Sequence, residues 1–181
     1  MENDKKRIKI KDKEFVLFIK ESDIRQYIQK IAADINKDLK GKDPLFLVVL
    51  NGSFMFAADL MKSVNIDCRI SFVKLSSYSG ITTTTVAREL IGLDECLTGR
   101  HVVIVEDIID TGHTMAHLLE KVRDLGAREI KIATLTFKPD AFKYDYPIDY
   151  IGISIPNDFI VGYGLDYDGY GRNSADIYKI V

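Results

Sequence analysis

The stretch Val102-Val-Ile-Val-Glu-Asp-Ile-Ile-Asp-Thr-Gly-His-Thr114 decides how this chain folds. Its first four residues are β-branched and apolar, which predicts a strand over 102–105 that is buried on both faces. After Gly112, apolar residues recur with the spacing of one helix face, at Met115, Leu118, Leu119 and Val122. We therefore expect 106–114 to be a strand-to-helix loop at the carboxyl edge of a parallel sheet, where open α/β folds bind ligands.

The predicted loop carries groups that suit a phosphate. Gly112 has no Cβ and lets the backbone approach a ligand closely, while Thr111 and Thr114 donate from their hydroxyl groups. The N-terminus of the following helix adds unpaired N–H groups. The three acids of the stretch would repel a phosphate unless they face ribose hydroxyls, a divalent cation or a proton in transit. The loop therefore predicts a site for a sugar phosphate with a metal ion.

A purely structural interpretation of the acids stays open beside this one. Glu106 and Asp107 are also typical of solvated charges at the end of a strand. Asp110 or Thr111 is equally suited to cap the helix that follows.

The rest of the chain alternates strand and helix patterns. Helices are predicted over 22–39, 54–64 and about 112–125, the last closed by Gly126, and further strands over 45–50, 68–75 and 130–136. This order predicts an open, doubly wound α/β fold, with a mostly parallel sheet flanked by helices on both faces. We expect a single domain over 1–181.

Two segments depart from that rhythm. Residues 76–86 have little charge or apolar periodicity, which predicts a long mobile loop, with an ordinary surface hairpin as the alternative. Residues from about 138 to 181 hold two short predicted strands, 150–155 and 159–162, and a glycine-rich tail. Together with the N-terminal strand region, we expect them to form a small hood over the sheet edge.

Composition narrows the class of protein. The 181 residues carry a formal net charge of −2, and the longest apolar runs, such as 45–50, are too short to span a bilayer. The basic residues between Lys5 and Lys13 alternate with Ile8 and Ile10, which favours an edge strand over a nucleic-acid surface. We therefore expect neither a nucleic-acid partner nor a membrane partner.

Localisation follows from the N-terminus and the cysteines. The first residues lack the apolar stretch of a secretory signal, so we expect a cytoplasmic protein. Cys68 and Cys96 lack the spacing of a zinc site or a disulfide framework, and we expect them to be buried free thiols.

The opening stretch resembles the phosphoribosyl diphosphate signature of type I phosphoribosyltransferases. The signature is two hydrophobic residues, two acids, two more hydrophobic residues and Asp-Thr-Gly-x-Thr. The remaining segments are similar in order and spacing to the 6-oxopurine, or hypoxanthine-guanine, phosphoribosyltransferases. The resemblance implies an enzyme of purine salvage, a pentosyltransferase that moves a phosphoribosyl group from 5-phosphoribosyl 1-diphosphate to N9 of hypoxanthine or guanine. The products would be IMP or GMP and pyrophosphate.

The resemblance also assigns roles around the reacting sugar. It implies that Glu106 and Asp107 hold the ribose hydroxyls, directly or through a metal, and that Asp110 is the general acid/base at N7 of the purine. The 5-phosphate would be held by Asp110, Thr111, Gly112, His113 and Thr114, with His113 where purine-specific members commonly carry lysine. Mg²⁺ is the implied cofactor, with Glu106, Asp107 and Asp166 as its ligands.

Further segments are implied to bind the leaving group and the base. Pyrophosphate would be contacted by Asn51, Gly52, Ser77, Tyr78 and Arg172. In the family the loop at 51–52 often holds a non-proline cis peptide, and lysine often stands at the position of Asn51. For the purine, Lys138 would donate to the exocyclic oxygen, the ring of Phe159 would stack on the base, and the backbone of Ile160 would contact its edge.

Other readings of these motifs have to be separated by experiment. A phosphoribosyltransferase for another base, such as xanthine, would keep the phosphate loop and differ in the hood. A non-enzymatic RNA-binding regulator on the same fold predicts an exposed basic face, which the balanced charge does not favour. The family resemblance also suggests a homodimer or homotetramer that acts on small-molecule substrates.

Overall fold

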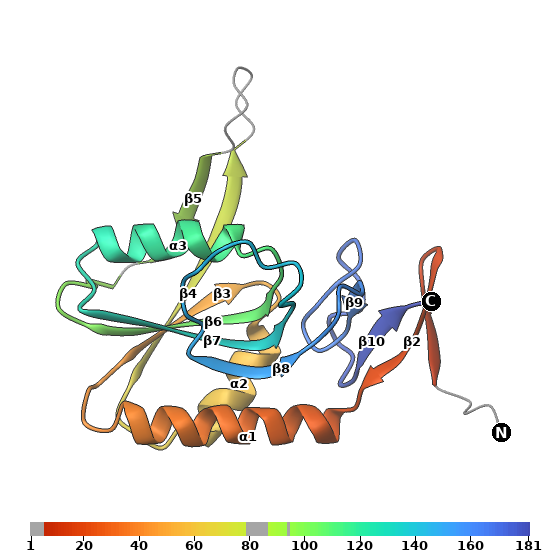
Figure 1. Cartoon of the computed structure of the whole chain (residues 1–181), viewed down its shortest axis with the longest axis horizontal. Coiled ribbons are helices and arrows are strands. Elements are labelled where there is room, and N and C mark those ends of the chain that lie inside the picture. The colour runs from red at the N-terminus through yellow and green to blue at the C-terminus, as the bar shows by residue number, and fades with distance from the viewer. Residues whose placement is uncertain (1–5, 79–86, 94) are drawn as a thin grey trace.

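The computed structural model describes residues 6–78, 87–93 and 95–181, and these form a large sheet and a smaller one (Figure 1). The large sheet has six strands in the order β5-β4-β3-β6-β7-β8. Five are parallel: β3 (Leu45–Leu50), β4 (Arg69–Tyr78), β6 (His101–Ile109), β7 (Glu129–Phe137) and β8 (Tyr150–Ser154). The sixth, β5 (Ala87–Ile91), is antiparallel to β4. The predicted α/β class is confirmed.

Helices cover both faces of this sheet, as the doubly wound prediction requires (Figure 1). On one face, α1 (Glu21–Asp38) and α2 (Phe54–Ser63) pack over Phe46 and Val48 of β3. On the other face, α3 (His113–Asp124) packs over Leu45 and Leu47. Because alternate residues of β3 and β6 enter the two cores, both strands are apolar throughout their inner parts.

The strand β6 is longer than the sequence predicts. We expected a loop over 106–114, but β6 continues to Ile109, and only residues 110–112 separate it from α3. The β-branched residues Ile108 and Ile109 keep pairing with Thr136 and Phe137 of β7, and Ile109 is buried. The acids Glu106 and Asp107 therefore belong to a strand whose direction the sheet fixes.

The segment predicted as a mobile loop begins later than expected. Residues 76–78 belong to β4 and pair with 87–89 of β5, so these three residues are strand. The interpretation of 79–86 as a mobile loop lies outside the described residues and stays a prediction.

The smaller sheet lies beside the carboxyl ends of β6 and β7 (Figure 1). Its strands are all antiparallel, in the order β1 (Arg7–Ile10), β2 (Lys13–Ile19), β10 (Ile177–Ile180) and β9 (Ile160–Val161). The N-terminal basic run is an edge strand, as predicted, with Arg7 and Lys9 exposed.

Two expectations about the remaining segments are wrong. Residues 150–154, expected in the hood, join the large sheet as β8, because Gly152 has no Cβ and lets this strand approach Leu135 of β7. Both cysteines are free, but Cys96 is exposed, and Cys68 is only half-buried where it packs against the margin of the core beneath α1 and α2. Among the described residues, no helix is long and apolar enough to cross a membrane.

Candidate active site

The parallel strands have the order 2-1-3-4-5 by their place in the chain, and the order reverses between β3 and β6. In sheets of this kind ligands bind at the carboxyl ends of the two strands that flank the reversal. The loop after β3 holds Asn51 and Gly52, and the loop after β6 holds Thr111 and Gly112. The topology therefore brings two segments, predicted separately for pyrophosphate and phosphate, to one crevice.

The cavity at this edge has a volume of about 340 Å³. Residues predicted for pyrophosphate, ribose, purine and metal line it together: Gly52, Asp107, Asp110, Lys138, Phe159, Ile160, Asp166 and Arg172. They come from the ends of β3, β6 and β7 and from the segment around β9. The candidate site thus draws on residues more than a hundred positions apart in the chain.

A second cavity of about 200 Å³ adjoins the first. It is lined by Glu106 and by the whole predicted phosphate loop, Asp110, Thr111, Gly112, His113 and Thr114. Asp110 and Ile108 line both cavities. A ligand with a phosphate at one end and a planar ring at the other would therefore pass Asp110 in the middle.

The phosphate loop is held from behind by a segment that the sequence analysis did not single out. Gly112 has φ +85°, and a Cβ at this position would lie 2.7 Å from the Phe142 ring. The hydroxyl of Tyr146 donates to the carbonyl of Gly112 at 2.8 Å, and the backbone N–H of Lys143 donates to that of Thr111 at 3.1 Å. The only signal in the sequence was the cluster of aromatic residues between 142 and 146.

His113 points to the same aromatic segment. Its ring contacts the ring of Tyr144 edge-on, with 5.3 Å between the centroids, and its Nδ1 shares a hydrogen bond with the Tyr144 hydroxyl. His113 is exposed, so it lines the phosphate cavity from the solvent side.

Glu106 and Asp107 form a carboxylate pair that is largely withdrawn from water. Burial, followed by the charge of Asp107, raises the pKa of Glu106 well above its usual range. Burial also raises the pKa of Asp107, although hydrogen bonds to its carboxylate, above all with Glu106, and the charge of Arg172 oppose this rise. The pair therefore binds protons more tightly than two solvated carboxylates at a strand end would.

Lys138 and Asp110 form an ion pair at the boundary between the two cavities. Lys138 Nζ lies 2.8 Å from Asp110 Oδ2. The lysine is only 7% exposed, whereas the aspartate remains half open to the cavities. Lys138 is therefore not a solvated surface charge, and its position at the end of β7 aims a buried donor at the larger cavity.

Asp166 and Arg172 are bound to each other. Arg172 Nη2 lies 2.7 Å from Asp166 Oδ1, and Arg172 Nη1 donates to the carbonyl of Gly164 at 2.7 Å. Asp166 also accepts from the backbone N–H of Gly169. Within 6–78, 87–93 and 95–181, no three carboxylate, histidine or cysteine side chains gather as a metal cluster. The predicted metal ligands Glu106, Asp107 and Asp166 therefore do not form one preassembled centre.

The remaining predicted residues lie around this arrangement. Phe159 is 45% exposed at the cavity and neighbours Tyr167, whereas Ile160 is buried. The Leu50–Asn51 peptide is cis, as the resemblance implies, and Asn51 is exposed. The backbone of Ser77 and Tyr78 lies at the end of β4, beyond its pairing with β3, and pairs with β5. Their contact with pyrophosphate stays a prediction.

Comparison with known proteins gives the same family. A family described as phosphoribosyl transferase domain matches residues 20–168. The chain is 43% identical to the hypoxanthine phosphoribosyltransferase of Haemophilus influenzae, over 91% of this chain and 94% of that protein. It is 36% identical to the hypoxanthine-guanine phosphoribosyltransferase of Streptococcus pneumoniae, over 96% and 92%.

The fold agrees as well. A crystal structure of a hypoxanthine-guanine phosphoribosyltransferase from Bacillus anthracis superposes with a TM-score of 0.85 at 37% identity, covering 96% of this chain and all of that one. The chain therefore belongs to the phosphoribosyltransferase family, in the group of the hypoxanthine and hypoxanthine-guanine phosphoribosyltransferases.

Proposed function

We propose that this protein transfers the phosphoribosyl group of 5-phosphoribosyl 1-diphosphate to N9 of hypoxanthine or guanine. The observation that carries the proposal is the ion pair of Asp110 and Lys138, which lies between the smaller cavity, lined by residues 110–114, and the larger one edged by Phe159. The names of the relatives support the choice of base, since they include hypoxanthine and hypoxanthine-guanine phosphoribosyltransferases.

The sugar would be held at both of its ends. Backbone N–H groups of 111–114 and the hydroxyls of Thr111 and Thr114 would bind the 5-phosphate at the start of α3. Glu106 and Asp107 would accept hydrogen bonds from the ribose hydroxyls, which would offset part of the cost of holding two carboxylates out of water. These contacts orient the anomeric carbon toward the larger cavity.

The base would be oriented by three groups. The Lys138 ammonium would donate to the exocyclic oxygen, Phe159 would stack on the purine face, and the backbone of Ile160 would contact the base edge. When the purine oxygen takes the Lys138 donor, Asp110 loses its ion-pair partner and becomes free to accept a proton. The ion pair thus couples recognition of a 6-oxopurine to the freeing of the Asp110 carboxylate as a proton acceptor.

The bond changes follow from this placement. N9 of the purine bonds to the anomeric carbon as the bond from that carbon to the pyrophosphate oxygen breaks, and pyrophosphate leaves with the electron pair. The proton on N7 passes to the carboxylate of Asp110. Arg172 would bind the leaving pyrophosphate, where a planar guanidinium matches two phosphate oxygens.

We propose Mg²⁺ as the cofactor. Carboxylate oxygens are the ligands that Mg²⁺ prefers. A cation beside Glu106 and Asp107 would stabilise their charged forms and so lower their raised pKa values. Asp166 would serve a second ion after Arg172 turns to pyrophosphate. When bound, Mg²⁺ neutralises charge on the diphosphate and so makes it a better leaving group.

We further propose a cytoplasmic enzyme that assembles as a homodimer or homotetramer. To test the activity directly, the purified protein is incubated with Mg²⁺ and 5-phosphoribosyl 1-diphosphate, with hypoxanthine, guanine or xanthine in separate reactions. Formation of the nucleotide is monitored by its absorbance. Formation of IMP and GMP is the expected result. Turnover of xanthine alone would favour the other-base enzyme, and salt-dependent RNA affinity without turnover would favour the regulator.

A further inference from the structure

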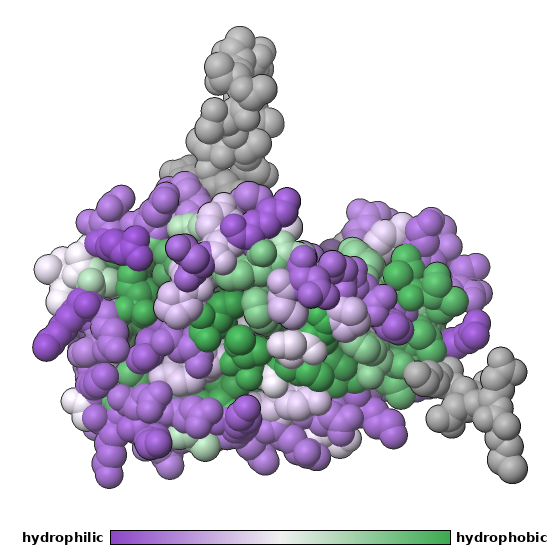
Figure 2. Space-filling model, in the orientation of Figure 1, coloured by the Kyte–Doolittle hydropathy of each residue, from purple (hydrophilic) through white to green (hydrophobic). Residues whose placement is uncertain are grey.

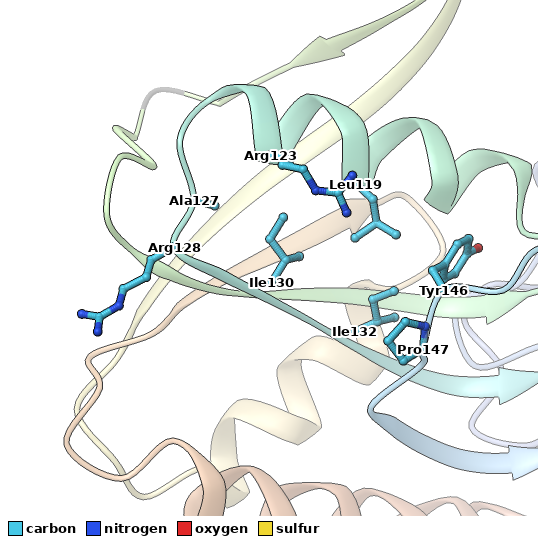
Figure 3. Close-up of a pocket in the computed structure, with 8 residues that line it drawn as sticks. All are labelled: Leu119, Arg123, Ala127, Arg128, Ile130, Ile132, Tyr146 and Pro147. Carbon is cyan, nitrogen blue, oxygen red and sulfur yellow. The ribbon is translucent and has the colours of Figure 1, made fainter.

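A cavity outside the candidate active site lies between the second half of α3 and the strand β7, with a volume of about 270 Å³ (Figure 3). Four apolar residues form part of its walls: Leu119 comes from α3, Ile130 and Ile132 from β7, and Pro147 from the connection to β8. Figure 3 shows Leu119 and Ile130 on opposite sides of the space. Hydrophobic surface is visible below α3 on this face of the molecule in Figure 2.

Two arginines, Arg123 and Arg128, complete the lining of this cavity. In Figure 3 the side chain of Arg123 extends along α3 toward Leu119, whereas that of Arg128 extends outward from the open end. The side chains of both have no ion pair or hydrogen bond within the described part of the chain, and no described carboxylate lines the cavity.

These two are exceptions among the arginines. The other arginine side chains that the structure describes all pair with a carboxylate: Arg7 with Glu14, Arg25 with Glu21, Arg69 and Arg100 with Asp43, and Arg172 with Asp166. The two arginines without a carboxylate thus line the same apolar cavity. A ligand that matches both features of the cavity would combine an apolar part with an anionic group.

We propose that this cavity is a second ligand site, which binds a small amphipathic anion: an apolar or aromatic ring that carries a phosphate, carboxylate or sulfonate group. The ring would remove the apolar walls from water, and the Arg123 guanidinium beside Leu119 would bind the anion through paired N–H donors, while Arg128 at the open end would add positive charge. The volume lies just below the range of drug-sized sites, which favours a ligand of one or two rings.

A residue that lines this cavity is hydrogen-bonded to the predicted phosphate loop of residues 110–114. Tyr146 lines the cavity, and its hydroxyl donates to the carbonyl of Gly112 at 2.8 Å. A ligand that shifts Tyr146 would therefore shift Gly112, the residue immediately before α3. Resting on the proposed function, this contact makes the cavity a regulatory site for the affinity toward 5-phosphoribosyl 1-diphosphate.

The binding step is tested with 8-anilino-1-naphthalenesulfonate, a fluorescent aromatic sulfonate. We expect one dye per chain, and a Kd that rises about tenfold or more in the double variant Arg123→Met, Arg128→Met, because charge-assisted hydrogen bonds are lost. The matched control Arg7→Met, Arg25→Met removes two ion-paired surface arginines and should keep the wild-type Kd. Ala127→Phe, which adds a ring to the lining and so fills part of the cavity, should abolish the fluorescence of the bound dye.

Three results would overturn the site: an unchanged Kd in the Arg123 and Arg128 variant, an equal loss in the control, or full displacement of the dye by GMP, which would place it in the active site.

The regulatory step is tested by the KM for 5-phosphoribosyl 1-diphosphate. Saturating dye should change that KM at least about twofold in the wild type and less in Tyr146→Phe. An unchanged KM would refute the coupling. Because dye binding is read by fluorescence, it is independent of whether the proposed activity is found.

Discussion

The backbone of Gly52 lies against the carboxylate of Asp107, so closely that a Cβ on Gly52 would be 1.7 Å from Asp107 Oδ2. Gly52 lies in the loop after β3, and Asp107 lies in the last part of β6. These two adjacent strands flank the point where the strand order reverses. A Cβ on Gly164 would in turn lie 1.9 Å from the carbonyl oxygen of Gly52. Three segments thus meet where a side chain at either glycine would intrude, and the position of the acid depends on that fit.

Gly52→Ala is expected to displace the carboxylate of Asp107 from the ribose position. Asp107 is 8% exposed and its Oδ1 accepts from the N–H of Ile108, so it has little room to yield. We expect kcat/KM for 5-phosphoribosyl 1-diphosphate to fall by about 10–100-fold, since a shift on the order of 1 Å at a binding group has this effect. Steady-state kinetics measure it, with circular dichroism to verify the fold. A wild-type kcat/KM would show that the contact does not position the acid.

Asp110→Asn keeps the shape of the side chain but removes the proton acceptor. We expect turnover to fall by about 10²–10⁴ while the affinity for the diphosphate substrate is largely preserved. The exposed Asp140, on the loop after β7, supplies a matched control in Asp140→Asn, which should retain wild-type turnover. Unchanged turnover in Asp110→Asn would remove this residue from the base role.

Lys138→Met keeps the aliphatic stem in its buried position and deletes the ammonium group. With the donor gone, the purine oxygen is left unpaired in a closed site. The loss in kcat/KM for hypoxanthine should therefore correspond to roughly 1–3 kcal/mol of transition-state stabilisation. The comparison substrate is a purine without the 6-oxo group, for which the loss should be smaller. An equal loss on both bases would mean that Lys138 acts through Asp110 and not on the oxygen.

Much of the fold could be predicted because its central strands are buried on both faces. The uninterrupted apolar runs at 45–50 and 102–105 indicate such strands by themselves. The end of β6 could not be predicted, since Glu106 and Asp107 are unusual in a strand and only pairing with β7 keeps them there. The support of Gly112 by Phe142 and Tyr146 was missed because it joins positions about thirty residues apart, which no local pattern encodes.

The carboxylate pair makes stability depend on pH. A carboxyl group whose pKa is raised in the folded protein binds a proton more tightly there than in the unfolded chain, so stability falls as pH rises from the ordinary carboxyl range toward the raised pKa of Glu106. Glu106→Gln removes this burden and should stabilise the ligand-free protein, on the order of 1 kcal/mol at pH 8 and less at pH 5. Thermal unfolding at both pH values measures it, and Glu120→Gln, at an exposed position on α3, is the control. Equal effects at the two pH values would contradict the raised pKa.

Phe159 allows binding of the base to be separated from stability. Its ring is 45% exposed, and it neighbours the tilted ring of Phe15 at 6.4 Å and the perpendicular ring of Tyr167 at 6.0 Å between centroids. Phe159→Ala should therefore change the unfolding temperature little, while the KM for hypoxanthine rises about tenfold or more, because stacking of a base on an aromatic ring contributes roughly 1–3 kcal/mol. Tyr170→Ala removes an aromatic ring that is 60% exposed in the same C-terminal segment and should keep both quantities near wild type. If the two variants raise the KM equally, the effect comes from the hood as a whole, and the stacking role of Phe159 is wrong.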